Sequence, residues 1–313
     1  MKPCRLWAIV AAASLLLTIG AGAAAADTLV AAGDIASPPG GGRADLATAK
    51  VVEQNRPTAV VALGDLQYEH GEYANFLGAY DHSWGRFKDL TRPAVGNHEY
   101  LDPAGPAAGY FRYFGRQAGN PAKGYYSFDI GPWHAIALNS NCGAAGAPSC
   151  AHGSAQWAWL KHDLTSHHQR CTLAFFHHPY RSSTGAHTGK AELKHLWAQL
   201  VAGGVDLVLN GHNHVYERLK PMRTMGQVDD HAPWTVIAGT GGRSLVPIPR
   251  STPTPSPGRP SSASTRWSCT PTAGSAPTRA PTARPATAGR SAATNGSGGS
   301  RSLSPSGPSW WHG

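Results

Sequence analysis

The chain has 313 residues, a formal net charge of +9 and a pI near 9.5. Taken alone, these values are typical of a basic protein that binds an anionic polymer. The charge is confined to the two ends, because residues 247–313 contain seven arginines and no acidic residue, and Lys2 and Arg5 supply the remaining two positive charges. Residues 27–246 are therefore neutral overall, and their composition gives no reason to expect a nucleic-acid-binding surface.

The chain begins with the pattern of a secretory signal. Lys2 and Arg5 precede an apolar stretch over 6–19, and three alanines before Asp27 form an A-x-A cleavage site. The apolar stretch is shorter than the about 20 residues that a membrane-spanning helix needs, and no later segment approaches that length. We expect cleavage after Ala26, export, and a soluble mature protein without a membrane span.

Residues 27–246 alternate short apolar runs with segments of helical periodicity, and we find no internal repeat. Apolar runs predict strands over 29–32, 58–63, 125–130, 134–138, 172–176, 206–209 and 234–238. Helical periodicity predicts helices over 44–54, 73–80, 154–165 and 191–201. Strands that alternate with helices indicate one domain of layered α/β architecture.

Polar side chains follow four of these apolar runs, as Asp34, Asp65, His177 with His178, and His212 with His214, and Asn97 with His98 follow a fifth, shorter apolar stretch in "RPAVGNHE". Each alone is typical of a turn. Five together indicate one site, because ligands bind beyond the carboxyl ends of strands in α/β sheets. Asp, Asn and His without Cys favour two divalent or trivalent cations over a structural zinc, and such a pair can clamp a phosphate and activate water if a carboxylate bridges it.

These residues carry a resemblance to a known family. The blocks are "GD" at 33–34, "GDLQY" at 64–68, "GNHE" at 96–99, "FFHHP" at 175–179 and "GHNHVYER" at 211–218. In order and spacing they resemble the signature blocks of the calcineurin-like metallophosphoesterases. The "GDxxY" and "GHxHxYER" forms resemble the purple acid phosphatase branch, including its small secreted bacterial relatives. The resemblance implies a β-sandwich of two mixed sheets flanked by helices.

The resemblance also implies a ligand set, position by position. Asp34, Asp65, Tyr68 and His214 would hold one ion, and Asp65, Asn97, His177 and His212 the other, with Asp65 bridging. Many members of the wider superfamily have a histidine where this chain has Ala36, but the purple acid phosphatases use the tyrosine instead. Because free tyrosine has a pKa near 10, phenolate binding favours Fe(III) at Tyr68, with Fe, Zn or Mn as the second ion.

Other residues match the family less directly. His98 resembles the family's non-ligand histidine that contacts the phosphate or protonates the leaving alcohol, and His187 resembles a second substrate histidine. We expect the remaining candidates to brace the site: His178, Glu99, Tyr216 and Arg218.

The resemblance implies a secreted hydrolase of small phosphoester substrates, acting as a phosphomonoesterase. Two alternatives stay open. The same site in a phosphodiesterase or nucleotidase would differ only in its pocket walls, and a secreted anion-binding protein would carry an inactive metal site. Substrate, second metal and oligomeric state do not follow from the sequence.

The cysteines and the C-terminal region complete the sequence-based expectations. Cys142 and Cys150 flank a Gly/Ala/Pro loop that they can close as a disulfide in an oxidising compartment, and the pairing of Cys171 does not follow from the sequence. Residues 247–313 have too few large apolar groups to order, so we expect a disordered tail, or alternatively the product of a shifted reading frame. Since such a tail offers no further strands, we expect the strand over 234–238 to form an uncovered sheet edge.

Overall fold

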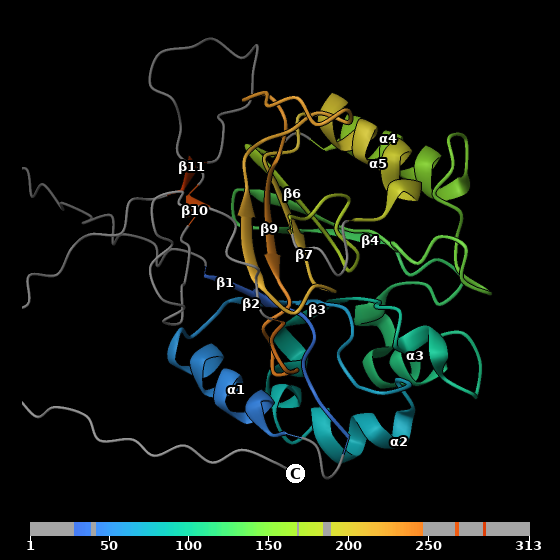
Figure 1. Ribbon diagram of the computed structural model, residues 1–313, viewed down its shortest axis with the longest axis vertical. Helices are drawn as coiled ribbons and strands as arrows, with labels where there is room; N and C mark the ends of the chain where they lie inside the picture. The colour runs from blue at the N-terminus through green and yellow to red at the C-terminus, as the bar shows by residue number, and fades with distance from the viewer. Residues whose placement is uncertain are drawn as a thin grey trace, which may run out of the picture.

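The computed structural model describes residues 28–38, 42–167, 169–183 and 189–246, together with the residue pairs 267–268 and 284–285 (Figure 1). The predicted signal, the predicted substrate histidine His187 and almost the whole predicted tail lie outside these residues. The domain boundaries at residues 26 and 246, and the disorder of the tail, therefore stay predictions. Strands β10 (Trp267–Ser268) and β11 (Arg284–Pro285) pair with each other.

Two sheets form the centre of the molecule. The smaller sheet has three parallel strands in the order β1 (Leu29–Ala32), β2 (Ala59–Leu63) and β3 (Thr91–Ala94). The larger, mixed sheet has the order β4 (Tyr126–Ile130), β5 (Trp133–Ala137), β6 (Cys171–Phe176), β7 (Leu207–Asn210), β9 (Trp234–Ala238) and β8 (Tyr216–Leu219). Its four inner strands are parallel, and its edge strands β4 and β8 are antiparallel to their neighbours.

The two sheets pack face to face because their inner faces are apolar. Leu63 of the small sheet and Phe175 and Leu209 of the large sheet belong to one buried cluster between them. The strand β2 is buried along its whole length, as expected of a parallel strand that is covered on both faces. The carboxyl ends of the parallel strands are therefore fixed by a packed core.

Helices cover the outer face of each sheet (Figure 1). On the small sheet lie α1 (Ala44–Gln54), α2 (Tyr73–Asn75), which continues as a π-helical turn over Phe76–Tyr80, and α3 (Ala108–Phe114). On the large sheet lie α4 (Ala155–Ser166) and α5 (Lys194–Ala202). Short 3₁₀ segments occupy Trp84–Leu90, Glu99–Leu101, Gly115–Ala118 and Ala191–Leu193. The predicted sandwich of two sheets flanked by helices is confirmed.

Several elements were not predicted, and one of them corrects an expectation. The helix α3 and the strands β3 and β8 are absent from the sequence-based assignment. Because β8 pairs along β9, the expectation that residues 234–238 form an uncovered sheet edge is wrong. The expected disulfide between Cys142 and Cys150 is present, with their Cα atoms 5.6 Å apart. None of the helices in the described ranges combines the length and hydropathy of a membrane crossing.

Candidate metal centre

The predicted site residues come together where the two sheets meet at the carboxyl ends of their parallel strands. β1, β2 and β3 lead into the segments that carry Asp34, Asp65 and Asn97, and β6 and β7 lead into His177 and His212. Backbone hydrogen bonds tie these ends together: Gly33 N–H donates to Ala238 O across the two sheets at 3.0 Å, and Gly211 N–H donates to His177 O at 3.0 Å. The convergence is therefore fixed by the main chain.

The backbone at three of these residues lies in the left-handed region. Asp34, Asp65 and His212 have φ values of 59°, 50° and 69°. Such values are uncommon for residues other than glycine, and each costs on the order of 1–3 kcal/mol, so they indicate positions held by a functional constraint. Gly64, at φ 84°, is required for a second reason, because a Cβ there would lie 2.6 Å from His177 Nδ1.

A first group of donor atoms surrounds the hydroxyl of Tyr68. This oxygen lies 2.8 Å from Asp34 Oδ1 and 3.1 Å from His214 Nε2, and His214 Nε2 lies 3.3 Å from Asp34 Oδ1. His214 Nδ1–H donates to the carbonyl of Ser244 at 3.0 Å, which turns Nε2 toward the group. We call Asp34, Tyr68 and His214 the Tyr68 group.

A second group surrounds His177 Nε2. This atom lies 3.0 Å from Asn97 Oδ1 and 3.2 Å from His212 Nδ1. His177 Nδ1–H donates to the Leu63 carbonyl at 2.9 Å, so Nε2 again faces the other donors. We call Asn97, His177 and His212 the His177 group.

Asp65 connects the two groups through one oxygen atom. Its Oδ2 lies 3.3 Å from Tyr68 Oη and 3.1 Å from His177 Nε2, while its Oδ1 accepts from the backbone N–H of His98 at 2.9 Å. Donor atoms that share a cation at about 2.0–2.2 Å lie about 3 Å apart. The spacing of the oxygen and nitrogen atoms in both groups therefore fits a pair of cations that share Asp65.

The electrostatics of the centre call for positive charge. Asp34 and Asp65 are buried, together with Glu99 and Tyr68. Burial alone would raise the pKa of Asp65 and lower that of His177, but their mutual attraction holds Asp65 well below its usual value and raises the pKa of His177 to about 9. Burial, followed by the charges of Asp34 and Asp65, raises the pKa of Tyr68 far above its ordinary value. A phenolate at Tyr68 therefore requires a strongly Lewis-acidic partner.

Glu99 is hydrogen-bonded to the backbone segments that carry Asp65 and Asn97. Its carboxylate accepts the backbone N–H groups of Asp65 at 3.0 Å, Leu66 at 2.7 Å, Gln67 at 3.3 Å and Gly96 at 2.7 Å. One buried side chain thus organises the segments that follow β2 and β3. Burial, and next the charge of Asp65, raise the pKa of Glu99 to about 7, although these N–H donors act in the opposite direction.

His98 lies at the rim of the centre, with about a quarter of its side chain exposed. Its Nδ1–H donates to the Glu69 carbonyl at 2.5 Å, and its Nε2 lies 3.9 Å from Asp65 Oδ2. His178 is buried, and its Nδ1 bonds the hydroxyl of Ser140 at 3.0 Å. His98 therefore presents a free ring edge to the site, whereas one nitrogen of His178 is taken up by a neighbouring loop.

Tyr216 and Arg218 lie farther along the edge strand β8. The guanidinium of Arg218 lies 5.9 Å from the centre of the Trp234 ring, on an exposed side chain. Between these two residues, Glu217 accepts from the Ser182 hydroxyl and from the backbone N–H of Ser183, both at 2.9 Å. In this strand, Glu217 rather than Arg218 fastens the loop that follows β6.

Sequence reasoning missed Arg243, which lies against Tyr68. Its guanidinium carbon is 4.5 Å from the Tyr68 ring centre, it pairs with Glu69 at 2.8 Å, and its backbone N–H donates to Asp34 O at 2.9 Å. The missed signal was the position of Arg243 after "GTGG" at the end of β9, which follows the same rule of polar residues beyond strand ends.

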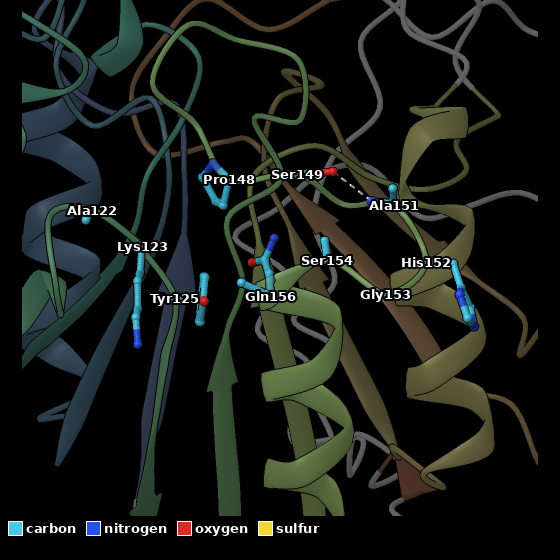
Figure 2. A pocket seen from close by; sticks show the side chains of 11 residues that line it. Ala122, Lys123, Tyr125, Pro148, Ser149, Ala151, His152, Gly153, Ser154 and Gln156 are labelled. Carbon is cyan, nitrogen blue, oxygen red and sulfur yellow. Dashed lines mark hydrogen bonds between the residues drawn. The ribbon is translucent and has the colours of Figure 1, made fainter.

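One surface hollow among the described residues lies away from these side chains. It measures about 630 Å³ and is bordered by Lys123, Tyr125, His152 and the first residues of α4 (Figure 2). No predicted ligand lines it, so we assign it no part in the chemistry. A smaller hollow of about 270 Å³ borders His178 and His212 and lies directly beside the His177 group.

Comparisons with known proteins give a family match and several relatives. Residues 26–216 match the family model of the calcineurin-like phosphoesterases. The chain is 30% identical to purple acid phosphatase 18 of Arabidopsis thaliana, over 57% of this chain and 42% of that protein. It is 28% identical to purple acid phosphatase 15 of the same plant, over 60% of this chain and 40% of that protein.

Among solved structures, the purple acid phosphatase PPD1 from yellow lupin (Lupinus luteus) seeds superimposes with a TM-score of 0.57 at 23% identity, covering 73% of this chain and 46% of that chain. The likeness to PPD1 supports the fold, and the chain spans less than half the length of each of these three relatives. Because the family model covers more than half of the sequence, the chain belongs to the calcineurin-like phosphoesterase family.

Proposed function

We propose that the protein is a secreted hydrolase of small phosphomonoesters, with two metal ions held by the Tyr68 and His177 groups. The observation that carries this proposal is the position of Asp65 Oδ2, within 3.3 Å of a donor atom in each group. A carboxylate oxygen shared in this way is what a two-ion centre requires. The likeness to purple acid phosphatases supports the choice of a phosphoester substrate.

The donor chemistry fits two different ions. The Tyr68 group offers a phenol, a carboxylate and an imidazole, a set suited to Fe(III), because only a strong Lewis acid offsets the raised pKa of Tyr68. The His177 group offers two imidazoles and an amide oxygen, which suit Fe, Zn or Mn. When bound, the two ions would supply an activated water and neutralise charge on the phosphate.

The protein's own residues would orient the substrate and deliver a proton. His98 is positioned for proton transfer because the Glu69 carbonyl fixes its Nδ1–H and leaves Nε2 facing the centre. We propose that Nε2–H donates to the leaving oxygen. His187, outside the described residues, is proposed as a second substrate contact.

The test combines metal analysis with hydrolysis. Purified protein should contain about two metal ions per chain, absorb visible light through an iron–phenolate band, and hydrolyse an aryl phosphate faster than the matching bis(aryl) phosphate. A protein that binds both ions but hydrolyses neither ester would disprove the proposed activity. A faster diester reaction would instead assign the site to diesters.

Export is proposed on two grounds. Residues 1–26 have the pattern of a signal, and the Cys142–Cys150 disulfide is typical of an oxidising compartment. Expression in a secreting host followed by N-terminal sequencing should give a protein that begins at Asp27. Recovery of uncleaved protein inside the cells would contradict this.

A further inference from the structure

The small hollow beside the His177 group has a cation in its wall. Its lining consists of His178, Pro179, Gly189, Lys190, Glu192 and His212. The rings of His178 and His212 lie 4.5 Å apart between their centres, and His212 Nδ1 lies 3.2 Å from His177 Nε2. The hollow is therefore adjacent to the proposed ion-binding atoms, and a substrate held there can extend into it.

The backbone fixes the position of Lys190. Its N–H donates to the Pro179 carbonyl at 2.9 Å, and its own carbonyl accepts from Leu193 N–H at 3.1 Å. The preceding Gly189 has a φ of 111°, and a Cβ at that position would lie 2.3 Å from the Tyr180 carbonyl oxygen. Only glycine permits so close a crossing, which places Lys190 next to the segment that follows His178.

The ammonium group of Lys190 has no protein partner among the described residues. Its side chain is half-buried, and neither a hydrogen bond nor an ion pair joins it to another described group. Burial lowers the pKa of Lys190, while the nearby Glu192 acts in the opposite direction. A partly desolvated cation without a partner favours an anionic ligand, because unpaired charge is costly to bury.

We propose that Lys190 binds a second anionic group on the substrate, so that the preferred substrates are phosphomonoesters whose leaving group carries a carboxylate or a further phosphate. This inference rests on the proposed function, since it assumes that the phosphate being hydrolysed lies at the two metal ions. The hollow measures about 270 Å³, a size that suits a small leaving group. Glu192 on the same wall limits the number of negative charges that the hollow accepts.

Binding of three non-hydrolysable probes tests the proposal independently of turnover. Methylphosphonate has no second anion, phosphonoacetate adds a carboxylate, and methylenediphosphonate adds a second phosphonate. In the metal-loaded parent protein, calorimetry should give tighter binding of one or both two-anion probes by on the order of 10- to 100-fold, the range expected of a charged hydrogen bond. Whichever probe gains affinity identifies the second anion.

Variants assign the gain to Lys190. The change Lys190→Met should abolish the gain and Lys190→Arg should keep it. Glu192→Gln should enlarge the gain because it removes the repelling charge. Lys194→Met is the matched control, since Lys194 is exposed at the start of α5 and does not line the hollow. A gain that persists in Lys190→Met, or that is absent from the parent protein, would overturn the inference.

Kinetics separate this inference from the proposed function. For substrates with a second anion, Lys190→Met should raise KM with little change in kcat, because the contact lies away from the reacting atoms. Hydrolysis of an aryl phosphate with an uncharged leaving group should be unaffected. If the protein hydrolyses an aryl phosphate, but neither probe binding nor the KM of two-anion substrates responds to the Lys190 variants, the proposed function stands and the role of Lys190 is rejected. If the protein hydrolyses no ester but its binding of the probes responds to these variants, the proposed hydrolase function is rejected and the role of Lys190 in anion binding stands.

Discussion

Asp65 is the residue whose loss should affect the proposed centre most. Its Oδ2 faces both donor groups, and its Oδ1 accepts from His98 N–H. The change Asp65→Ala should therefore remove a ligand from both ions and lower kcat/KM on the order of 1000-fold, equivalent to several kcal/mol of lost stabilisation. Metal content per chain, measured beside kcat/KM, should fall together with activity.

His187→Ala serves as the comparison for this prediction. A residue that contacts only substrate should leave the metal content unchanged and lower activity less than Asp65→Ala does. Circular dichroism checks that both variants are folded. Parent-like activity in Asp65→Ala would rule out the two-ion centre.

At the residue scale, Asp34, Asp65 and His177 could be found from the sequence because each closely follows an apolar run, whereas Tyr68 was expected only from the family resemblance. A parallel strand fixes the position of the next residue or two, so Asp34 and His177 are placed by their strands. Arg243 and Lys190 do not directly follow an apolar run and were not identified in this way. Their positions depend on backbone contacts with Asp34 and Pro179, which are far away in the sequence or across a tight glycine turn.

At the scale of elements, Glu99 joins the loops that follow β2 and β3. Its two oxygens accept four backbone N–H groups, including that of Asp65. In Glu99→Gln, an amide NH₂ would replace one of the carboxylate oxygens that accept backbone N–H groups in the parent protein. Some of these backbone donors would then face another donor and lose their acceptor. We expect weaker metal affinity by about 10- to 100-fold, the usual cost of losing a group that positions a ligand.

Metal titration of the folded Glu99→Gln protein checks this expectation. Glu53→Gln is a suitable control, because Glu53 is an exposed carboxylate on α1 that has no contact with the centre. Equal metal affinity in Glu99→Gln and the parent protein would show that the loops are held in place without the carboxylate.

A second cluster, outside the proposed centre, joins β4, β5 and α4. The buried ring of His134 has its Nδ1 at 2.7 Å from Asp129 Oδ1 and its Nε2 at 2.8 Å from Asp163 Oδ2. His167 stacks on His134 with ring centres 4.0 Å apart, and Ser127 donates to Asp163 at 2.7 Å. Stacked, nearly parallel rings do not point their nitrogens at a common ion, so we interpret the cluster as an ion-paired imidazolium that links strand to helix.

This cluster should make stability depend on pH. Burial alone would lower the pKa of His134, but Asp163 and Asp129 raise it above its ordinary 6.5. The contribution of His134 to the stability of the folded protein is therefore complete below about pH 6.5, and it is lost as pH rises through the pKa of the folded state. Burial alone would raise the pKa of Asp163, but His134 and Ser127 lower it below 3.8, so its contribution is present above that pH and is lost as pH falls through its folded-state value. The pairing is strongest between these two limits.

His134→Gln should therefore cost most stability in mildly acidic solution. At pH 5.5 we expect a loss of about 2 kcal/mol, reduced from the value of a fully buried pair because Asp129 is half exposed, and a fall in Tm of roughly 5 °C. At pH 9 the difference should shrink. Thermal melts of parent, His134→Gln and the exposed control His162→Gln at both pH values measure it. A pH-independent difference would contradict the charged pairing.

Prediction of the strands succeeded where the sequence has a continuous apolar run and failed where it has none. The apolar run of β2 and the Ser154 cap of α4, whose hydroxyl accepts from Trp157 N–H, are readable from the sequence. In contrast, β3 has four residues including a proline, and β8 overlaps the end of the "GHNHVYER" block. Short strands are defined by their partners in the sheet, and β8 becomes a strand because β9 lies beside it.

At the scale of the whole molecule, the segment after β9 completes the centre. Gly241 N–H donates to the Gly33 carbonyl at 2.8 Å, His214 Nδ1–H donates to the Ser244 carbonyl at 3.0 Å, and Val246 N–H donates to the His214 carbonyl at 3.0 Å. Residues 239–246 thus join the two sheets and orient one predicted ligand. The functional unit should extend to Val246.

Truncation tests where the metal-binding unit ends. A protein that ends at Val246 keeps every contact to Asp34 and His214 that the described residues make, so it should bind as much metal as the parent and melt within roughly 2 °C, equivalent to under about 1 kcal/mol. A protein that ends at Gly239 loses the Ser244 acceptor and the Arg243 side chain, and it should lose the ion of the Tyr68 group first, because His214 is no longer oriented.

Limited proteolysis of the full chain should likewise trim it to near residue 250 without loss of metal. Metal loss in the protein that ends at Val246, or on trimming, would show that residues after 246 pack on the domain and that the predicted boundary is wrong.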